Sequence, residues 1–168
     1  MCIRDSAYID QRAIDKKVYP KQIAFNSIPF VDCFLENNYT REEMKMVWET
    51  HKILDENISV NPTAVRVPVL VGHAESIYIE TEKEIDIELA KNCLNEFAGI
   101  SVIDNVQEVD FPTSFEHGHG TDDVYVGRIR KGLSKNNSLN LWVVADNVRK
   151  GAALNSIQIA ENLVGSEI

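Results

Sequence analysis

Paired cysteines are missing from this sequence. Its three cysteines lie far apart, and no two of them form the C-x-x-C spacing of a zinc or redox motif. We therefore expect neither a disulfide framework nor a metal site, and we expect a reducing, cytoplasmic setting. Cys33 and Cys93 are predicted to be small, buried apolar residues.

Long apolar runs and an excess of positive charge are missing as well. No run approaches the ~18 apolar residues that a membrane-spanning helix needs, so we predict no membrane partner. Lys and Arg number 17 against 26 Asp and Glu, which gives a net charge of −9. This balance argues against a nucleic-acid partner, because such partners are bound by clustered basic residues.

A glycine-rich dinucleotide loop is also absent. Gly118 and Gly120 do not form a G-x-G-x-x-G motif, and no strand-to-helix turn is predicted around them. His117 and His119 flank Gly118, but two histidines without a third ligand make a weak metal site. We interpret residues 117–119 as a solvated loop.

The chain does contain enough apolar material for one domain. Of its 168 residues, 44% are hydrophobic, and a chain of about 150 residues buries roughly 70% of its unfolded surface without disulfides or metals. We expect residues 1–18 to be a disordered or non-native start. Residues 19–168 are predicted to form the domain, as part of a larger protein.

Three helices are predicted. Thr40 and Glu43 form a capping box before a helix that should end near Asp55. A second helix is expected over residues 86–98, with Gly99 as its stop, and a third over residues 148–164. The second helix is predicted to turn these residues inward: Leu89, Ala90, Cys93, Leu94 and Phe97.

Short β-branched and apolar segments predict the strands. They are expected at residues 64–71, 76–81, 100–104, 124–129 and 139–145, with a loop over 105–122. Pro68 makes the first of them an edge strand or an irregular one. Strands and helices interleave, with connections too short for every one to be a crossover helix. The fold class predicted is therefore α+β, a mixed, largely antiparallel sheet covered by helices.

Four residues are candidates for chemistry, and each has a simpler alternative. His73 follows a glycine and suits proton transfer, but it could merely cap a strand end. Arg66 lies between two valines and either faces solvent or grips a carboxylate bidentately. Glu42 and Lys45 are spaced as a surface ion pair, and they could instead bind an ammonium and a phosphate.

These weak signals occur in one order along the chain, within a series of distinctive segments. From about Tyr19 onward, the series resembles the C-terminal half of aspartate-semialdehyde dehydrogenases, in the segments Gln22–Asn26 with Ile28-Pro29, Glu42–Lys45, Arg66–Val69, Gly72-His73, Val126–Arg130 and Leu141–Ala153.

The resemblance implies both a fold and a reaction. The fold is the semialdehyde dehydrogenase dimerisation domain, which is like the C-terminal domain of glyceraldehyde-phosphate dehydrogenase. The reaction is NADPH-dependent reductive dephosphorylation of L-aspartyl 4-phosphate to L-aspartate 4-semialdehyde. It serves the biosynthesis of lysine, diaminopimelate, methionine, threonine and isoleucine. The partners implied are the acyl phosphate and phosphate as small molecules, NADP as cofactor, and further copies in a homodimer or homotetramer.

Roles for individual residues also follow from the resemblance. It implies that His73 is the general acid and base, that Arg66 holds the substrate carboxylate, and that Asn147 approaches the nicotinamide of the cofactor. It implies that Glu42 lies near the substrate amino group and that Lys45 holds the phosphate. The family's nucleophile, in an Asn-Cys motif, and its NADP-binding domain have no counterpart here, so the fragment should be inactive alone.

The spacing of Arg66 and His73 poses a geometric condition. Seven residues of straight strand span about 23 Å and place residues an odd number apart on opposite faces. We therefore predict a bulge or bend between Pro68 and Gly72. Two alternatives remain open: a non-catalytic dimerisation or interaction domain, and the related acetylglutamyl-phosphate reductase.

Overall fold

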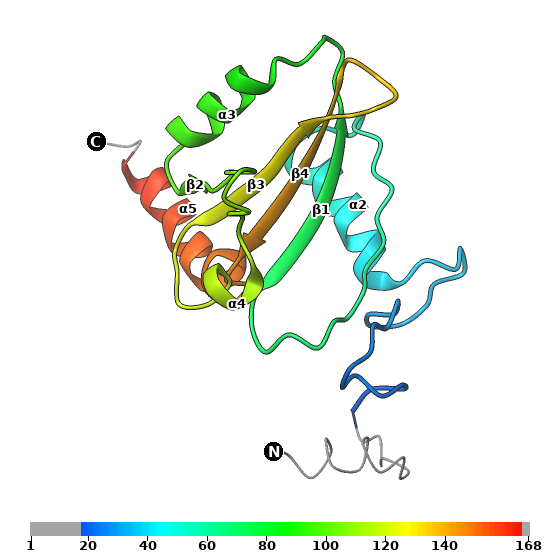
Figure 1. Cartoon of the computed structure of the whole chain (residues 1–168). Coiled ribbons are helices and arrows are strands. Elements are labelled where there is room, and N and C mark those ends of the chain that lie inside the picture. The colour runs from blue at the N-terminus through cyan, green and yellow to red at the C-terminus, as the bar shows by residue number, and fades with distance from the viewer. Residues whose placement is uncertain (1–17, 166–168) are drawn as a thin grey trace. The chain divides into compact units, whose positions relative to one another are not determined.

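The computed structural model describes residues 18–165, which fall into two compact units that divide between Pro68 and Val69. Each unit is described by itself below, and Figure 1 labels their elements. The expected irregular start at residues 1–18 lies outside the described residues, apart from Val18. Within residues 18–165, no helix is long and apolar enough to cross a membrane.

The first unit is built around helix α2 (Arg41–Ile53), which begins at the predicted capping box. The backbone N–H of Glu43 donates to the Thr40 hydroxyl at 3.3 Å, and the backbone N–H of Thr40 donates to the Glu43 carboxylate at 2.7 Å. Thr40 is only 1% exposed. The prediction of this helix is confirmed, and its end at Ile53 lies close to the expected Asp55.

The Glu43 carboxylate also holds a distant segment of the same unit. It accepts the backbone N–H of Ala64 at 2.9 Å, beside the bond from Thr40. These two backbone donors, Thr40 first, lower the pKa of Glu43 from its ordinary value of 4.5. The carboxylate therefore ties the chain just before Arg66 to the first turn of α2.

The strand predicted at residues 64–71 is wrong. Arg66 forms a single antiparallel bridge with Ile28, with both backbone bonds at 2.9 Å, and no ladder extends from it. Pro68 lies two residues after Arg66, at the next hydrogen-bonding position of such a pairing. Pro68 cannot donate a backbone hydrogen bond, so the pairing cannot continue toward Asn26. On the other side, the N–H of Ala64 donates to the Glu43 carboxylate and that of Phe30 donates to the carbonyl of Ile28, so neither is available to lengthen it. The chain instead bends at residues 68, 70 and 71, which confirms the predicted irregularity.

The second unit contains a four-stranded sheet in the order β1-β4-β3-β2. Its strands are β1 (His73–Glu80), β2 (Ile100–Val102), β3 (Val124–Lys131) and β4 (Ser138–Ala145). β4 pairs antiparallel with both β1 and β3, while β2 pairs parallel with β3. The predicted fold class, a mixed and largely antiparallel sheet with helices, is confirmed.

Helix α3 (Ile87–Glu96) covers one face of this sheet, beside β2 and β3 (Figure 1). Asp86 caps it by accepting the backbone N–H of Leu89 at 2.9 Å. The apolar residues that it packs on the sheet are spaced three and four apart, as one helix face requires. The core of this layer contains Ile87, Ala90 and Leu94 against Val126, Ile129, Leu139 and Leu141.

Part of the predicted inward face of α3 is wrong. Leu89 is 62% exposed, Phe97 is 66% exposed, and Cys93 is also exposed. These three residues recur every four positions and form a second stripe, rotated away from the Ile87 stripe that the sheet covers. Cys33, predicted buried, is half-buried.

The loop predicted at residues 105–122 contains one short helix, α4 (Ser114–His117). Thr113 caps it, and the indole N–H of Trp142 on β4 donates to the carbonyl of Pro112 at 2.9 Å. This bond fixes the loop against β4. β4 itself has no exposed residue, as its continuous apolar run predicts.

The chain leaves the sheet through a π-helical turn, η1 (Arg149–Ala153), and continues as α5 (Leu154–Gly165). The backbone N–H of Gly151 donates to the carbonyl of Asp146 at 3.1 Å, five residues back. The predicted helix over residues 148–164 is confirmed, but its first turn is wider than an α-turn. Such turns occur often at functional sites.

Replacing Thr40 by alanine should destabilise the first unit by about 1 kcal/mol, because the N–H of Glu43 loses its capping acceptor. Urea unfolding followed by far-ultraviolet circular dichroism measures the loss. Glu49→Ala, an exposed change on the same helix, should stay within about 0.5 kcal/mol. Equal effects of the two changes would contradict the capping role.

The Glu43 contacts should also make stability depend on pH. The folded pKa is lowered, so their contribution is fully present above the unfolded value, about 4.5, and is lost as pH falls through the folded pKa. The difference in free energy of unfolding between wild type and Glu43→Gln should therefore be largest near neutral pH. It should shrink in acid. A difference that does not change with pH would rule out the charged contacts.

Candidate active site

His73 and Asn147 lie at the same end of the second unit's sheet. In the β1–β4 ladder, His73 pairs with Ala145, and Asn147 follows Ala145 by two residues. His73 is exposed and Asn147 is half-buried. Within residues 18–165, neither side chain has a hydrogen bond or ion pair. An imidazole and an amide without partners among the described residues thus lie near the same end of the β1–β4 ladder.

The backbone before His73 is held in a conformation that needs glycine. Gly72 has a φ of +80°, and a Cβ there would lie 2.5 Å from the carbonyl oxygen of Gly118. A side chain at this position would therefore be both strained and blocked by backbone. This direct contact sets the start of β1 against the loop that follows α4.

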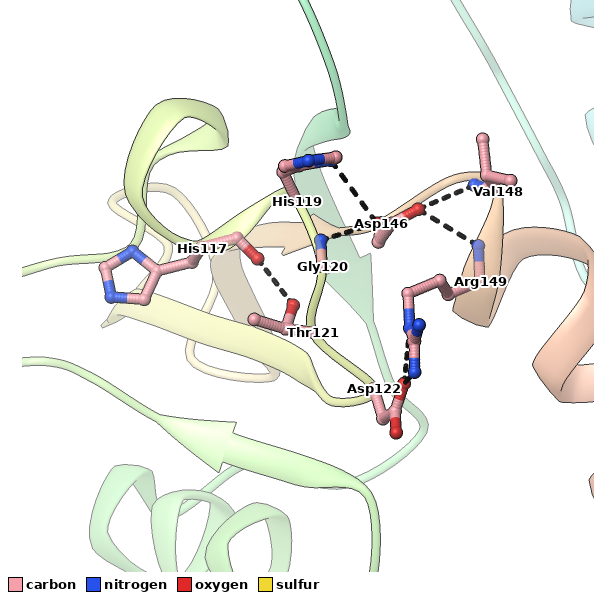
Figure 2. A network of polar contacts seen from close by, with 8 residues as sticks. All are labelled: His117, His119, Gly120, Thr121, Asp122, Asp146, Val148 and Arg149. Atoms are coloured by element: carbon pink, nitrogen blue, oxygen red, sulfur yellow. Dashed lines mark hydrogen bonds and ion pairs between the residues drawn. The ribbon is translucent and has the colours of Figure 1, made fainter.

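The same loop is tied to the end of β4 by Asp146, as Figure 2 shows. The Asp146 carboxylate accepts the backbone N–H groups of Gly120 at 2.8 Å, Val148 at 2.8 Å and Arg149 at 3.0 Å. These donors, that of Arg149 first, lower the pKa of Asp146 from its ordinary value. Asp146 is 4% exposed, so the carboxylate is a buried anion held by backbone dipoles.

Sequence reasoning assigned no role to Asp146, although it lies in the segment that carried the resemblance. A signal was present, because an aspartate directly after an apolar strand and before a helix is a typical helix-capping pattern. Its contact with Gly120 has no such signal. The two residues are far apart in the sequence and meet only through the sheet.

The loop at residues 117–119 is more ordered than the sequence suggested. The ring Nδ1 of His117 accepts the backbone N–H of Thr113 at 3.2 Å, and the Thr121 hydroxyl donates to the carbonyl of His117 at 2.8 Å. The ring of His119 is exposed and lies 3.9 Å from the Asp146 carboxylate. Among the described residues, no group of three or more His, Cys, Asp or Glu could hold a metal ion.

The remaining candidates, Glu42, Lys45 and Arg66, belong to the first unit. Lys45 and Glu42 form an ion pair at 3.2 Å on the surface of α2, and this bond raises the pKa of Lys45. The guanidinium of Arg66 lies 5.0 Å from the centre of the Tyr19 ring, which it faces as a cation over an aromatic face. Within the first unit, the structure therefore joins Glu42 and Lys45 as an ion pair. Within the second, it places His73 and Asn147 near the same end of the β1–β4 ladder.

Comparison with known proteins places this geometry in a family. Residues 5–150 match the family described as semialdehyde dehydrogenase, dimerisation domain. The chain belongs to this dimerisation-domain family. The predicted resemblance is confirmed, and the sheet with its β1–β4 ladder is the family's fold.

Individual relatives support membership of the same family. The aspartate-semialdehyde dehydrogenase of Shewanella violacea is 58% identical over 151 residues, which cover 89% of this chain and 44% of the relative. The crystal structure of aspartate semialdehyde dehydrogenase II from Vibrio cholerae, complexed with ASA, matches with a TM-score of 0.89 at 48% identity. It covers 97% of this chain and 48% of that one.

A more distant structure also matches. The aspartate semialdehyde dehydrogenase with NADP from Candida albicans gives a TM-score of 0.67 at 26% identity, over 84% of this chain and 45% of that chain. The present chain spans less than half the length of the relatives it matches.

Substituting alanine for Gly72 should destabilise the second unit more than substituting alanine for Gly120. Both glycines have positive φ, which costs another residue roughly 1–2 kcal/mol. A Cβ at Gly120 would meet nothing within 4 Å, whereas one at Gly72 would collide with Gly118. Denaturant unfolding of both variants measures the difference, and equal losses would show that the Gly72–Gly118 contact has no energetic weight.

Proposed function

We propose that this chain supplies the acid–base, substrate-binding and dimerisation half of an NADP-dependent aspartate-semialdehyde dehydrogenase. The reaction is the reductive dephosphorylation of L-aspartyl 4-phosphate to L-aspartate 4-semialdehyde, or its reverse. The observation that carries the proposal is the exposed, uncommitted imidazole of His73 at the strand end shared with Asn147, within this dimerisation-domain family.

His73 is proposed to move the protons of the reaction. A thiol nucleophile must lose a proton before it attacks an acyl carbon, and the oxygen of the thiohemiacetal formed on reduction must gain and lose one. The usual pKa of histidine, near 6.5, lets one side chain do both near neutral pH. The imidazole at the start of β1 has no competing hydrogen bond among the described residues, so both ring nitrogens are open to substrate.

Three residues of the first unit are proposed to bind the charged groups of the substrate. Arg66 would hold the carboxylate, since its guanidinium lies over the Tyr19 ring and its fork of N–H donors suits a bidentate contact. Lys45 would hold the phosphate and Glu42 the ammonium. The exposed Lys45–Glu42 pair is worth only about 0–1 kcal/mol, so substrate groups of opposite charge can replace it.

Asn147 is proposed to contact the nicotinamide end of NADP. Its side-chain amide offers a donor and an acceptor, neither of them used within residues 18–165, and this matches the donor and acceptor of a carboxamide. Bound NADPH supplies the hydride. The residues that would cradle its phosphates are proposed to lie in the other half of the enzyme, together with the nucleophilic cysteine.

The wider role follows from the same proposal. The product would feed the biosynthesis of lysine, diaminopimelate, methionine, threonine and isoleucine in the cytoplasm. Membership of a dimerisation-domain family supports assembly as a homodimer or homotetramer. Without the cofactor-binding half, the chain alone is expected to be inactive.

A chimeric enzyme tests the proposal. This chain would replace the matching 44% of the Shewanella violacea enzyme, and phosphate-dependent formation of NADPH from L-aspartate 4-semialdehyde would be followed by absorbance. The chimera should be active. His73→Asn should lower kcat by about 10²–10⁴-fold, because the proton acceptor is lost.

His51→Asn provides the matched control, because His51 is a histidine of α2 with no assigned role. It should change kcat by less than about threefold. A folded chimera without activity, which binds its own copies in size-exclusion chromatography, would instead support a non-catalytic dimerisation domain. An active chimera unaffected by His73→Asn would remove the acid–base role.

A further inference from the structure

Asp146 joins two separate stretches of backbone at the end of β4. One carboxylate oxygen accepts the N–H groups of Val148 and Arg149, and the other accepts the N–H of Gly120 (Figure 2). The backbone carbonyl of Asp146 accepts the N–H of Gly151, which closes the π-turn. Both the carboxylate and the backbone carbonyl of Asp146 therefore accept hydrogen bonds, and its side chain is almost fully buried.

Each stretch held by Asp146 borders a proposed active-site residue. Val148 and Arg149 directly follow Asn147, so the capped turn fixes the backbone of that residue. Gly120 lies two residues after Gly118, whose backbone contacts Gly72 immediately before His73. A chain of direct contacts therefore runs from His73 through the loop of residues 118–120 to Asp146 and Asn147.

A carboxylate is the side chain that this position requires. Three N–H donors converge on it from two directions, and a carboxylate has acceptor lone pairs on both oxygens. An amide has one acceptor oxygen and one NH₂ group. It can accept from Val148 and Arg149 or from Gly120, but not from both sides.

We propose that Asp146 is a positioning residue of the reaction, whose contact with Gly120 fixes His73 and Asn147 relative to one another. The inference rests on the function proposed above. Asp146 does not meet substrate in this role. It acts through the loop and the turn that it connects, so its loss should affect the chemical step more than substrate binding.

Asp146→Asn in the active chimera tests this role selectively. The amide oxygen should stay with the two donors of the turn, which leaves its NH₂ group facing the N–H of Gly120 and breaks that contact alone. We expect kcat to fall by about 10–100-fold, as misplacement of catalytic groups by about 1 Å can do. The KM for the semialdehyde should change by less than about threefold, because the substrate-binding residues are untouched.

Asp122→Asn is the matched control. Asp122 lies on the same loop and pairs with the Arg149 guanidinium, so it also connects the loop to the turn, but the pair is exposed. Exposed pairs contribute little, and kcat should change by less than about twofold. A loss as large as that of Asp146→Asn would show that charge on the loop matters, rather than the buried contact, and would overturn the proposal.

Amide hydrogen exchange in the chain itself gives a second readout that does not depend on activity. In Asp146→Asn, the Gly120 amide should exchange faster, whereas the amides of β4 residues such as Leu141 and Val144 should keep their protection. Loss of protection across β4 would show that the variant unfolds the sheet, and the inference of selective positioning would then fail.

The outcomes separate this inference from the function on which it rests. A wild-type chimera without dehydrogenase activity would refute the proposed function, and the positioning role with it. An active wild-type chimera whose kcat is unchanged by Asp146→Asn, with Gly120 exchange accelerated, would refute the positioning role and leave the function standing.

Discussion

The antiparallel pairing of β1 with β4 is the constraint on which the candidate site depends. It sets His73 opposite Ala145 and so brings the start of one strand to the end of another. The residues proposed for catalysis in the second unit lie at this pair, as His73 does, or just beyond it, as Asn147 does. Because a slip of one residue would turn every side chain to the opposite face, the buried apolar side of β4 fixes the register. The same burial that stabilises the sheet therefore places the imidazole.

Around this strand end, most of the contacts that fix the loop and the turn involve backbone groups. Gly72 and Gly118 meet through their backbones, and a buried carboxylate gathers three backbone N–H groups. Such contacts leave few rotatable bonds between the fixed sheet and the reactive groups. The side chains of His73 and Asn147 can then stay free of partners among the described residues without being loosely placed, which suits the roles proposed for them.

Within the first unit, proline limits the pairing around Arg66. The bridge between Ile28 and Arg66 stops after one pair, because Pro68 has no N–H to extend it on one side. On the other side, the N–H of Ala64 is taken by the Glu43 carboxylate. Arg66 consequently stays outside any ladder, with its guanidinium over Tyr19. The β-branched composition of residues 64–71 favoured a strand, and the missing donors outweighed that preference. In α3, similarly, two apolar stripes competed for the core, and the sheet covered only the one through Ile87.

The sequence by itself determined the elements whose signals are local. The capping box at Thr40, the continuous apolar run of β4 and the mixed α+β pattern were predictable, because each depends on neighbours within a few residues. It also supplied the kinds of residue at the candidate site. Tertiary structure alone decided that His73 lies opposite Ala145, that Gly118 blocks any side chain at Gly72, and that Asp146 reaches Gly120. Those contacts join residues far apart in sequence, and only the pairing of the strands sets the distances between them.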